Sequence, residues 1–517
     1  LKGRREKLLS ALLDAPGRGR LLLSDFQMRA LQRMLKDLET NRSRGMIVCA
    51  GTGTGKTLAF YLPALTHVGD LLTRDSYWTK AIAIYPRNEL LKDQFSETYL
   101  EARCLDTVTQ AQAGRKILIG AFFGPTPNYA TEKQVRDKWP EKSAGGYICP
   151  YLRCPRCGHG NLVWRVKDIA TQTERLYCTS RDCGFATGDD ELLLTRNKMR
   201  KMPPDILFTT TEMLNRNMGD SRYCHVFGVD TANRPQLVLL DEVHTYEGVH
   251  GAQVALLLRR WKHAVGGKLH FTGLSATLKD ADNFFADLVG LPQPLVEEIK
   301  PLPNELVQEG MEYLLALRGD PVSATSLLST TIQAAMLLGR ILDPLQSSPS
   351  DGIYGRRVFI FTDDLDVTNR LYHNLLDAEG FNSARRLVKQ PLAALRSSNR
   401  PQNALRMNEG QSWQLCEEIG HSNGLARPLL VGRTSSQDTG VDRESSIVVA
   451  TASLEVGYND PLVGAVIQHK APRDMASFLQ RIGRAGRNFR MRPWTVVVLS
   501  DYGRDRIAYQ GYDLLFN

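Results

Sequence analysis

The segment Ala50-Gly51-Thr52-Gly53-Thr54-Gly55-Lys56-Thr57 restricts the fold of this chain more than any other stretch. It follows the apolar run 46–49, which reads as a buried strand, and it precedes the helix-like run 58–62. Strand, glycine-rich turn and helix in this order form a phosphate-binding loop, whose backbone N–H groups converge on phosphate oxygens. Within it, Lys56 would reach the β- and γ-phosphates and the Thr57 hydroxyl would bind Mg²⁺. The segment therefore predicts a parallel α/β fold that binds ATP.

A second apolar run, residues 237–240, leads into the acidic box Asp241-Glu242-Val243-His244. The carboxyl ends of parallel strands are where the catalytic groups of such sheets gather. Asp241 would complete the magnesium site, and Glu242 would orient and deprotonate the attacking water. His244 is either an ordinary surface histidine or a relay to a second lobe. The box therefore predicts hydrolysis of the bound nucleotide.

The string Gln480-Arg481-Ile482-Gly483-Arg484-Ala485-Gly486-Arg487 places arginines more than 400 residues after the phosphate-binding loop. Alone, such a string is more often a solvated surface or a phosphate-contacting patch. Guanidinium groups also stabilise the charge that develops on a transferring phosphoryl group, and a separate element can supply them. We therefore expect Arg484 and Arg487 to act on the γ-phosphate and Gln480 to face the nucleotide, which requires a second lobe.

These motifs, together with others in the same order, resemble those of superfamily 2 DExH-box helicases. The resemblance implies two RecA-like lobes, and it includes Ser275-Ala276-Thr277 after the acidic box and the run 358–362 at the start of the second lobe. It implies that Gln27, Gly457 and Asp460 contact the nucleotide. The residues that it places on a nucleic-acid strand are Pro86, Arg87, Thr209, Thr210, Thr211 and Thr451.

The residues that follow the acidic box narrow this resemblance. His244-Thr245-Tyr246-Glu247-Gly248-Val249-His250-Gly251 is similar to the MrfA-like branch of DNA helicases. Gln468-His469-Lys470-Ala471-Pro472-Arg473-Asp474 also resembles helicases of bacterial anti-phage systems, such as DrmA of DISARM. Members of this branch act on DNA, which makes DNA the expected partner in preference to RNA. Residue spacing alone does not separate the two polymers.

Five of the nine cysteines lie between residues 149 and 183. Cys154 and Cys157 form one close pair and Cys178 and Cys183 form another, about 20 residues later. Four thiolates in this pattern predict a closed, structural zinc site; the alternatives are disulfides or free thiols. Cys149 and His159 are further candidate ligands. The basic and aromatic residues of this insertion could contact phosphates or bases, or could bind a partner protein: Arg153, Arg156, Trp164, Arg165 and Lys167.

At 517 residues the chain is too long for one core. We expect an α/β first lobe in two parts, 1–124 and 201–300, interrupted by a zinc-ribbon-containing insertion at 125–200. A helical connector at 301–350 and a second α/β lobe at 351–517 would follow. The net charge of +9 favours a polyanionic partner without proving one.

The expected activity is an ATP-dependent DNA helicase or translocase that uses ATP, Mg²⁺ and Zn²⁺ and works with a protein partner that supplies other activities. The alternatives are an ATP-gated DNA clamp or loading subunit, and an RNA helicase. The sequence shows no persuasive nuclease or methyltransferase constellation, no long apolar span and no secretory signal. We therefore expect a cytoplasmic protein that has no membrane partner.

Overall fold

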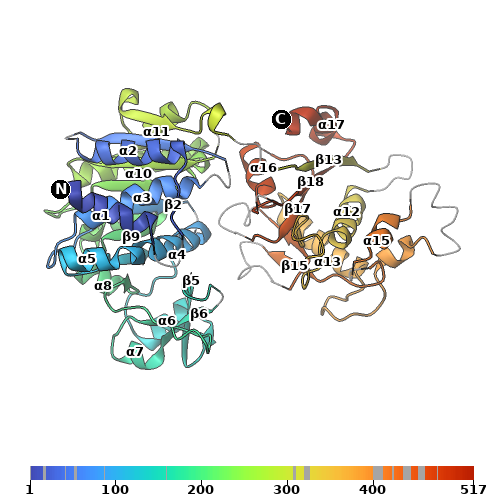
Figure 1. The fold of residues 1–517 in the computed structure, drawn as a ribbon, viewed down its shortest axis with the longest axis horizontal. Coiled ribbons are helices and arrows are strands. Elements are labelled where there is room, and N and C mark those ends of the chain that lie inside the picture. The colour runs from blue at the N-terminus through green and yellow to red at the C-terminus, as the bar shows by residue number, and fades with distance from the viewer. Residues whose placement is uncertain are drawn as a thin grey trace. The chain divides into compact units, whose positions relative to one another are not determined.

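In the computed structural model the chain forms two compact units, Leu1–Leu306 and Val307–Asn517 (Figure 1). The structure describes residues 2–15, 19–40, 42–51, 55–86, 88–158, 160–276, 278–306, 310–319, 326–399, 411–421, 424–434, 444–451, 460–473, 475–488 and 490–516. Within these ranges, no helix has both the length and the apolar character that a membrane crossing requires.

An eight-stranded parallel sheet forms the centre of the first unit, in the order β12-β1-β11-β10-β2-β9-β3-β8. Its central strands are apolar and buried, as in parallel sheets that helices cover on both faces. The strands span Arg44–Cys49 (β1), Ala81–Tyr85 (β2), Ile119–Phe122 (β3), Leu192–Leu193 (β8), Ile206–Thr210 (β9), Leu237–Leu240 (β10), His270–Ser275 (β11) and Val296–Ile299 (β12).

Helices surround this sheet (Figure 1). They span Lys2–Leu13 (α1), Asp25–Leu38 (α2), Lys56–Asp70 (α3), Asn88–Cys104 (α4), Asp106–Ala113 (α5), Arg196–Lys201 (α8), Thr211–Asn217 (α9), Gly248–Val265 (α10) and Ala281–Val289 (α11). Helix α3 begins directly after the phosphate-binding loop, and it keeps an apolar, almost fully buried surface along most of its length. The loop is therefore attached to one of the most buried helices of the unit.

The insertion is a small antiparallel sheet in the order β4-β5-β6-β7, with two short helices. Its elements span Glu132–Lys138 (α6), Lys142–Ser143 (β4), Gly146–Arg153 (β5), Asn161–Arg165 (β6), Val166–Ala170 (α7) and Leu176–Cys178 (β7). Residues 192–201 form β8 and α8, and β8 pairs with β3 of the parallel sheet. The insertion therefore ends before Leu192 and not at residue 200, because these buried leucines return the chain to the lobe.

Aromatic side chains join the insertion to the rest of the first unit. The Tyr151 ring packs edge-on against Phe95, Phe123 and Trp139, and Trp139 contacts Trp164 at a centroid distance of 5.6 Å. Trp164 is fully buried. The expectation that Trp164 belongs to an exposed aromatic edge is therefore wrong, because this ring fills the core between the insertion's strands.

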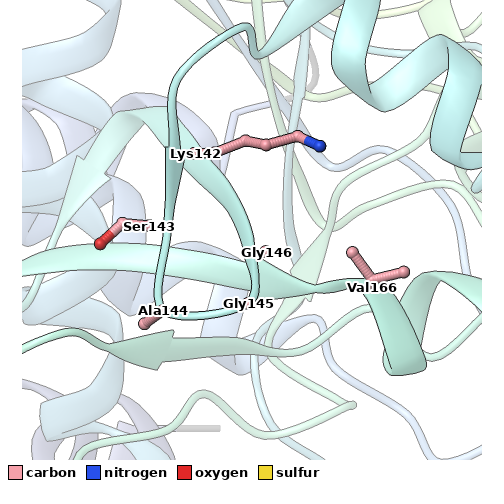
Figure 2. A pocket seen from close by; sticks show the side chains of 6 residues that line it. All are labelled: Lys142, Ser143, Ala144, Gly145, Gly146 and Val166. Atoms are coloured by element: carbon pink, nitrogen blue, oxygen red, sulfur yellow. The ribbon is translucent and has the colours of Figure 1, made fainter.

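A pocket of about 310 Å³ lies at the hairpin that joins β4 and β5 (Figure 2). Lys142, Ser143, Ala144, Gly145, Gly146 and Val166 line it. None of these residues is a candidate nucleotide, metal or strand-contacting residue, and the pocket adds nothing to those sites.

A second parallel sheet, β13-β18-β17-β14-β16-β15, forms the centre of the second unit. Its strands span Tyr313–Arg318 (β13), Arg357–Phe361 (β14), Val431–Thr434 (β15), Ile447–Ala450 (β16), Val463–His469 (β17) and Trp494–Leu499 (β18). The helices span Leu327–Ile341 (α12), Leu365–Ala378 (α13), Gln414–Ile419 (α15), Met475–Ile482 (α16), Gly503–Gln510 (α17) and Tyr512–Phe516 (α18).

The segment expected as a helical connector contributes to this second sheet. Leu314 and Leu315 lie in the edge strand β13, which pairs in parallel with β18, and among the described residues of 301–350 only α12 is a long helix. The helical reading of these two leucines is wrong because pairing with β18 decides their conformation. The predicted architecture itself, two α/β lobes with parallel sheets and an insertion in the first, is confirmed.

Candidate functional site

The nucleotide-binding residues of the first unit lie at one edge of its sheet. Strand β11 lies between β1 and β10, so the loop after β1, the acidic box after β10 and Ser275 at the end of β11 share the carboxyl edge. Lys56 is the first residue of α3. Parallel strands bring these distant segments together, as the sequence predicts. Thr52, Gly53 and Thr54 lie outside the described residues.

Gln27 on α2 holds the end of the phosphate-binding loop. Its Nε2 donates a hydrogen bond to the Gly55 carbonyl oxygen (2.9 Å), and its Oε1 accepts one from the Ser24 N–H (2.9 Å). Gly55 has a φ of +74°, and a Cβ there would lie 2.6 Å from Gln27 Nε2. The positive φ therefore favours glycine at this position, and a Cβ would displace the Gln27 amide from its hydrogen bond. The predicted contact of Gln27 with adenine stays a prediction.

Asp241 and Glu242 form a buried acidic pair. Burial, and then the Glu242 charge, raise the pKa of Asp241 to about 7, while Lys56 and the Glu242 N–H oppose the rise. That N–H donates to Asp241 Oδ1 at 2.8 Å, and Glu242 adopts a left-handed φ of +48°. A desolvated carboxylate beside a second one gains from a bound cation, so Asp241 fits the Mg²⁺ site expected with Thr57.

His244 is buried at 8% exposure, so the reading as an ordinary surface histidine is wrong. Its Nδ1 lies 3.2 Å from Ser275 Oγ and 3.5 Å from Glu242 Oε2. Ser275, which the sequence places in a helicase-like motif without a stated role, thus contacts the acidic box through this imidazole. Thr277 lies outside the described residues. His244 is placed to orient Glu242, and a relay to the second unit stays a prediction.

The residues expected to contact a nucleic-acid strand differ in burial: some are buried and others are partly exposed. Thr209 is fully buried, and its Oγ1 donates to the Phe122 carbonyl oxygen at 2.9 Å. Thr210 caps α9, because its Oγ1 accepts the Met213 N–H at 3.3 Å. The side chain of Thr211 is partly exposed, as is that of Pro86. Arg87 lies outside the described residues. The strand contacts of this group stay a prediction.

In the second unit, Arg481 joins α16 to the sheet. Its guanidinium contacts Asp363 Oδ1 at 2.6 Å and donates to Gln468 Oε1 at 2.8 Å. Gln480 and Arg484 are buried beside it, and Arg484 Nε donates to the Gln480 carbonyl oxygen at 3.2 Å. Arg481 therefore positions the helix that carries the other predicted residues. Arg487 follows α16 and is partly exposed.

Asp460 is engaged within the second unit. Its Oδ2 accepts a hydrogen bond from buried Arg357 at 3.0 Å, and its Oδ1 accepts the Leu462 N–H at 2.9 Å. The Thr451 N–H reaches the Thr434 carbonyl oxygen at 3.4 Å. Gly457 lies outside the described residues. The predicted contacts of Asp460 with the nucleotide and of Thr451 with a strand remain predictions.

The predicted zinc ligands Cys154, Cys157, Cys178 and Cys183 form a cluster in which all four Sγ atoms lie within 4.8 Å of one another. The pairs 154–183 and 157–178 are 3.5 and 3.7 Å apart. Four sulfurs at about 2.3 Å from one zinc ion would be about 3.8 Å apart. The N–H groups of Gly160 and Ser180 point at the sulfurs of Cys157 and Cys178 (3.3 and 3.4 Å). The cluster therefore has the form of a zinc ribbon.

Cys149 lies outside this cluster. It is buried in β5 and is not among the four sulfurs that lie together, so it is a packing residue and not a fifth ligand. His159 lies outside the described residues. On the surface of the insertion, Arg153, Arg156 and Lys167 are exposed, whereas Arg165 stacks on Tyr177 at 3.6 Å. The insertion therefore exposes basic side chains that could contact a phosphate, but its buried tryptophan, Trp164, is not part of that surface.

Family models match both units. The DEAD/DEAH box helicase model matches residues 24–117 and 165–284, and the helicase conserved C-terminal domain matches residues 433–489. The gap in the first match covers the start of the insertion. The chain therefore carries the two domains of a DEAD/DEAH-box helicase core, as the motifs predict.

Two relatives in sequence indicate which helicases this chain is similar to. The chain is 29% identical over 345 residues to the Lhr helicase/uracil glycosylase of Escherichia coli strain K12, a match to 66% of this chain and 21% of that protein. It is 26% identical over 291 residues to the Druantia protein DruE of E. coli strain UMEA 4076-1, a match to 48% of this chain and 16% of that protein. The chain is thus related to Lhr-like helicases and to DruE, and spans only a small part of their length.

Solved helicase structures share this fold. MrfA bound to DNA superposes with a TM-score of 0.55 at 18% identity, over 99% of this chain and 50% of that one. Mss116p bound to single-stranded RNA gives a TM-score of 0.57 at 14% identity, over 99% of this chain and 75% of that one. Such identities show the fold and leave the choice of nucleic acid to other evidence.

Proposed function

We propose that this chain is the motor of an ATP-dependent DNA helicase or translocase. The observation that carries the proposal is the carboxyl edge of the first sheet, where Lys56, Asp241 and Glu242 belong to the matched helicase domain. The sequence relation to Lhr helicases favours DNA, whereas the fold shared with MrfA and Mss116p fits either nucleic acid. Of the two settings that the sequence leaves open, anti-phage defence and DNA repair, the likeness to DruE supports the first.

Each residue has a defined task in this proposal. Lys56 binds the terminal phosphates, and Glu242 takes the proton of the attacking water while His244 orients its carboxylate. Bound Mg²⁺, held by Thr57 and Asp241, would neutralise charge on the phosphate oxygens. Arg484 and Arg487 of the second unit are the proposed arginines for the charge that develops on the γ-phosphate.

The test is ATPase activity of the full chain with single-stranded DNA, duplex DNA and RNA. We expect stimulation by DNA, and we expect Glu242→Gln to lower kcat by roughly 10²- to 10⁴-fold, because it removes the general base. Glu247→Gln, an exposed carboxylate of the same segment, is the matched control and should leave kcat within a factor of about two. Equal activity of the two variants contradicts the proposed roles.

The second candidate is an ATP-gated DNA clamp that closes without unwinding. The same nucleotide site serves both functions, so ATPase activity does not separate them. A strand-displacement assay beside a translocation assay does: a clamp hydrolyses ATP on DNA and gives neither displacement nor movement. Stimulation by RNA alone supports the RNA helicase alternative.

A further inference from the structure

A cavity of about 320 Å³ lies at the amino edge of the first sheet, opposite to the nucleotide-binding edge. Four neighbouring strands, β1, β11, β10 and β2, begin there. We call it the distal cavity. Its lining residues include Arg42, Trp78, Arg234, Lys268 and His270. Because β1 has six residues at about 3.3 Å each, the cavity lies roughly 17 Å from the phosphate-binding loop.

The charge of the distal cavity is positive. Arg42, Arg234 and Lys268 are exposed, and within the described part of the chain none of them forms an ion pair with a carboxylate. The one acidic residue of the lining, Asp37, already has two arginine neighbours, Arg33 at 2.7 Å and Arg44 at 3.6 Å. Three cations therefore line the cavity, and its one carboxylate is already paired with two other arginines.

Buried His270 is a second feature of the cavity, independent of its charge, that indicates a bound ligand. This first residue of β11 is 4% exposed and lines the cavity. Neither of its ring nitrogens has a hydrogen-bond partner among the residues that the structure describes. A buried imidazole that makes no hydrogen bond loses the free energy of its hydration without compensation. Both nitrogens are shielded from solvent, and a phosphate oxygen that reached the ring from the cavity would supply the missing partner.

We propose that the distal cavity binds a phosphate group, supplied either by a nucleic-acid strand or by a free nucleotide-sized anion. Arg234 and Lys268 neutralise the phosphate, and the His270 ring donates a hydrogen bond to one of its oxygens. Trp78, whose ring carries Lys80 Nζ at 4.4 Å, offers an aromatic surface beside it. This site is separate from the nucleotide site, and it does not rest on the proposed motor function.

The test uses the full chain with Lys56→Ala, which disables the phosphate-binding loop as a competing site. Inorganic pyrophosphate is titrated by calorimetry, and a single-stranded oligonucleotide by fluorescence anisotropy at several salt concentrations. The cavity variant adds Arg234→Ala and Lys268→Ala. The control variant adds Lys7→Ala and Lys201→Ala, two exposed lysines of the same unit, and thus loses the same charge.

We expect the cavity variant to bind pyrophosphate at least about ten-fold more weakly than the control, because two charge-assisted hydrogen bonds are lost. A parallel loss for the oligonucleotide, with a salt slope lower by about 1, identifies a strand as the source of the phosphate. A loss for pyrophosphate alone identifies a free anion. Equal affinities of the cavity and control variants for both probes overturn the proposal.

The imidazole gives a second readout, which keeps the test valid if the double substitution lowers stability. The Cε1–Hε1 resonance of His270, assigned by its loss in His270→Phe, should shift when pyrophosphate is added to the Lys56→Ala chain. A resonance that stays unchanged at saturating pyrophosphate contradicts the proposed contact.

Discussion

His67 and His270 of the first unit stay neutral because of where they are buried. Burial is the largest cause that lowers the pKa of His67 to about 4 and that of His270 to about 3, and nearby positive charges add to it. His67 shares a hydrogen bond with Gln236 (3.0 Å), whereas His270 has no such partner among the described residues. Both groups take up protons near pH 6.5 once the chain unfolds.

The sign of the resulting pH dependence follows from proton uptake. Between pH 6.5 and about 4 the unfolded state binds more protons than the folded state, so the free energy of unfolding falls as the pH falls. From pH 7 to pH 5 we expect His270, whose folded pKa is about 3, to lower the free energy of unfolding by about 2 kcal/mol. His270→Phe should remove that part of the loss.

The measurement is denaturant unfolding of the first unit at pH 7 and pH 5. Exposed His263 provides the control variant His263→Phe, which should keep the wild-type pH dependence. An unchanged pH dependence in His270→Phe would show that the imidazole is protonated in the folded chain.

At the level of residues, position in the sequence predicts some of this chemistry and not the rest. Asp241 and Glu242 directly follow an apolar run, and the end of a strand fixes where they lie. His244 and Ser275 are 31 residues apart, and only the adjacent placement of β10 and β11 brings them within hydrogen-bonding distance. His270 looks like any strand residue until burial shows that its ring lacks a partner.

Among the elements, the cysteine cluster has the sharpest test. We expect about one zinc ion per purified chain by elemental analysis, since four thiolates close the coordination sphere. Cys178→Ser should lose the zinc and loosen the antiparallel sheet, because a zinc ion bound by the cluster would join β7 to the turn at Cys154 and Cys157. Cys104→Ser, at a cysteine outside the cluster, should keep full zinc content. A wild-type chain without zinc contradicts the assignment.

The sequence predicts an element correctly where a local residue pattern alone determines its structure. Spacing alone predicts the four cysteines that lie together, with Cys149 and His159 left open as alternatives, because two cysteine pairs can form a closed site. Spacing does not show that Cys149 packs within β5 or that Trp164 is buried. Strands β8 and β13 depend on pairing with β3 and β18, far away in the sequence, so their short apolar runs are equally compatible with a helix or a loop.

At the scale of the whole molecule, the proposed motor needs residues from both units. Arg487→Ala should lower DNA-stimulated kcat by roughly 10³-fold or more while ATP still binds, because an arginine on the transferring phosphoryl group acts mainly in the transition state. Arg484→Lys should also lower kcat, since an ammonium keeps the charge and loses the planar fork of donors.

Arg506→Ala is the matched control for the arginine variants, because Arg506 is an exposed arginine of α17 in the same unit. Steady-state ATPase assays give kcat, and equilibrium binding of a fluorescent ATP analogue gives nucleotide affinity for each variant. An arginine that only stabilises the second unit would change its thermal unfolding together with kcat. An arginine that acts on the nucleotide changes kcat and leaves the unfolding of its own unit unaltered. Wild-type kcat in Arg487→Ala would show that the first unit hydrolyses ATP without this arginine, and the two-unit mechanism would then be wrong.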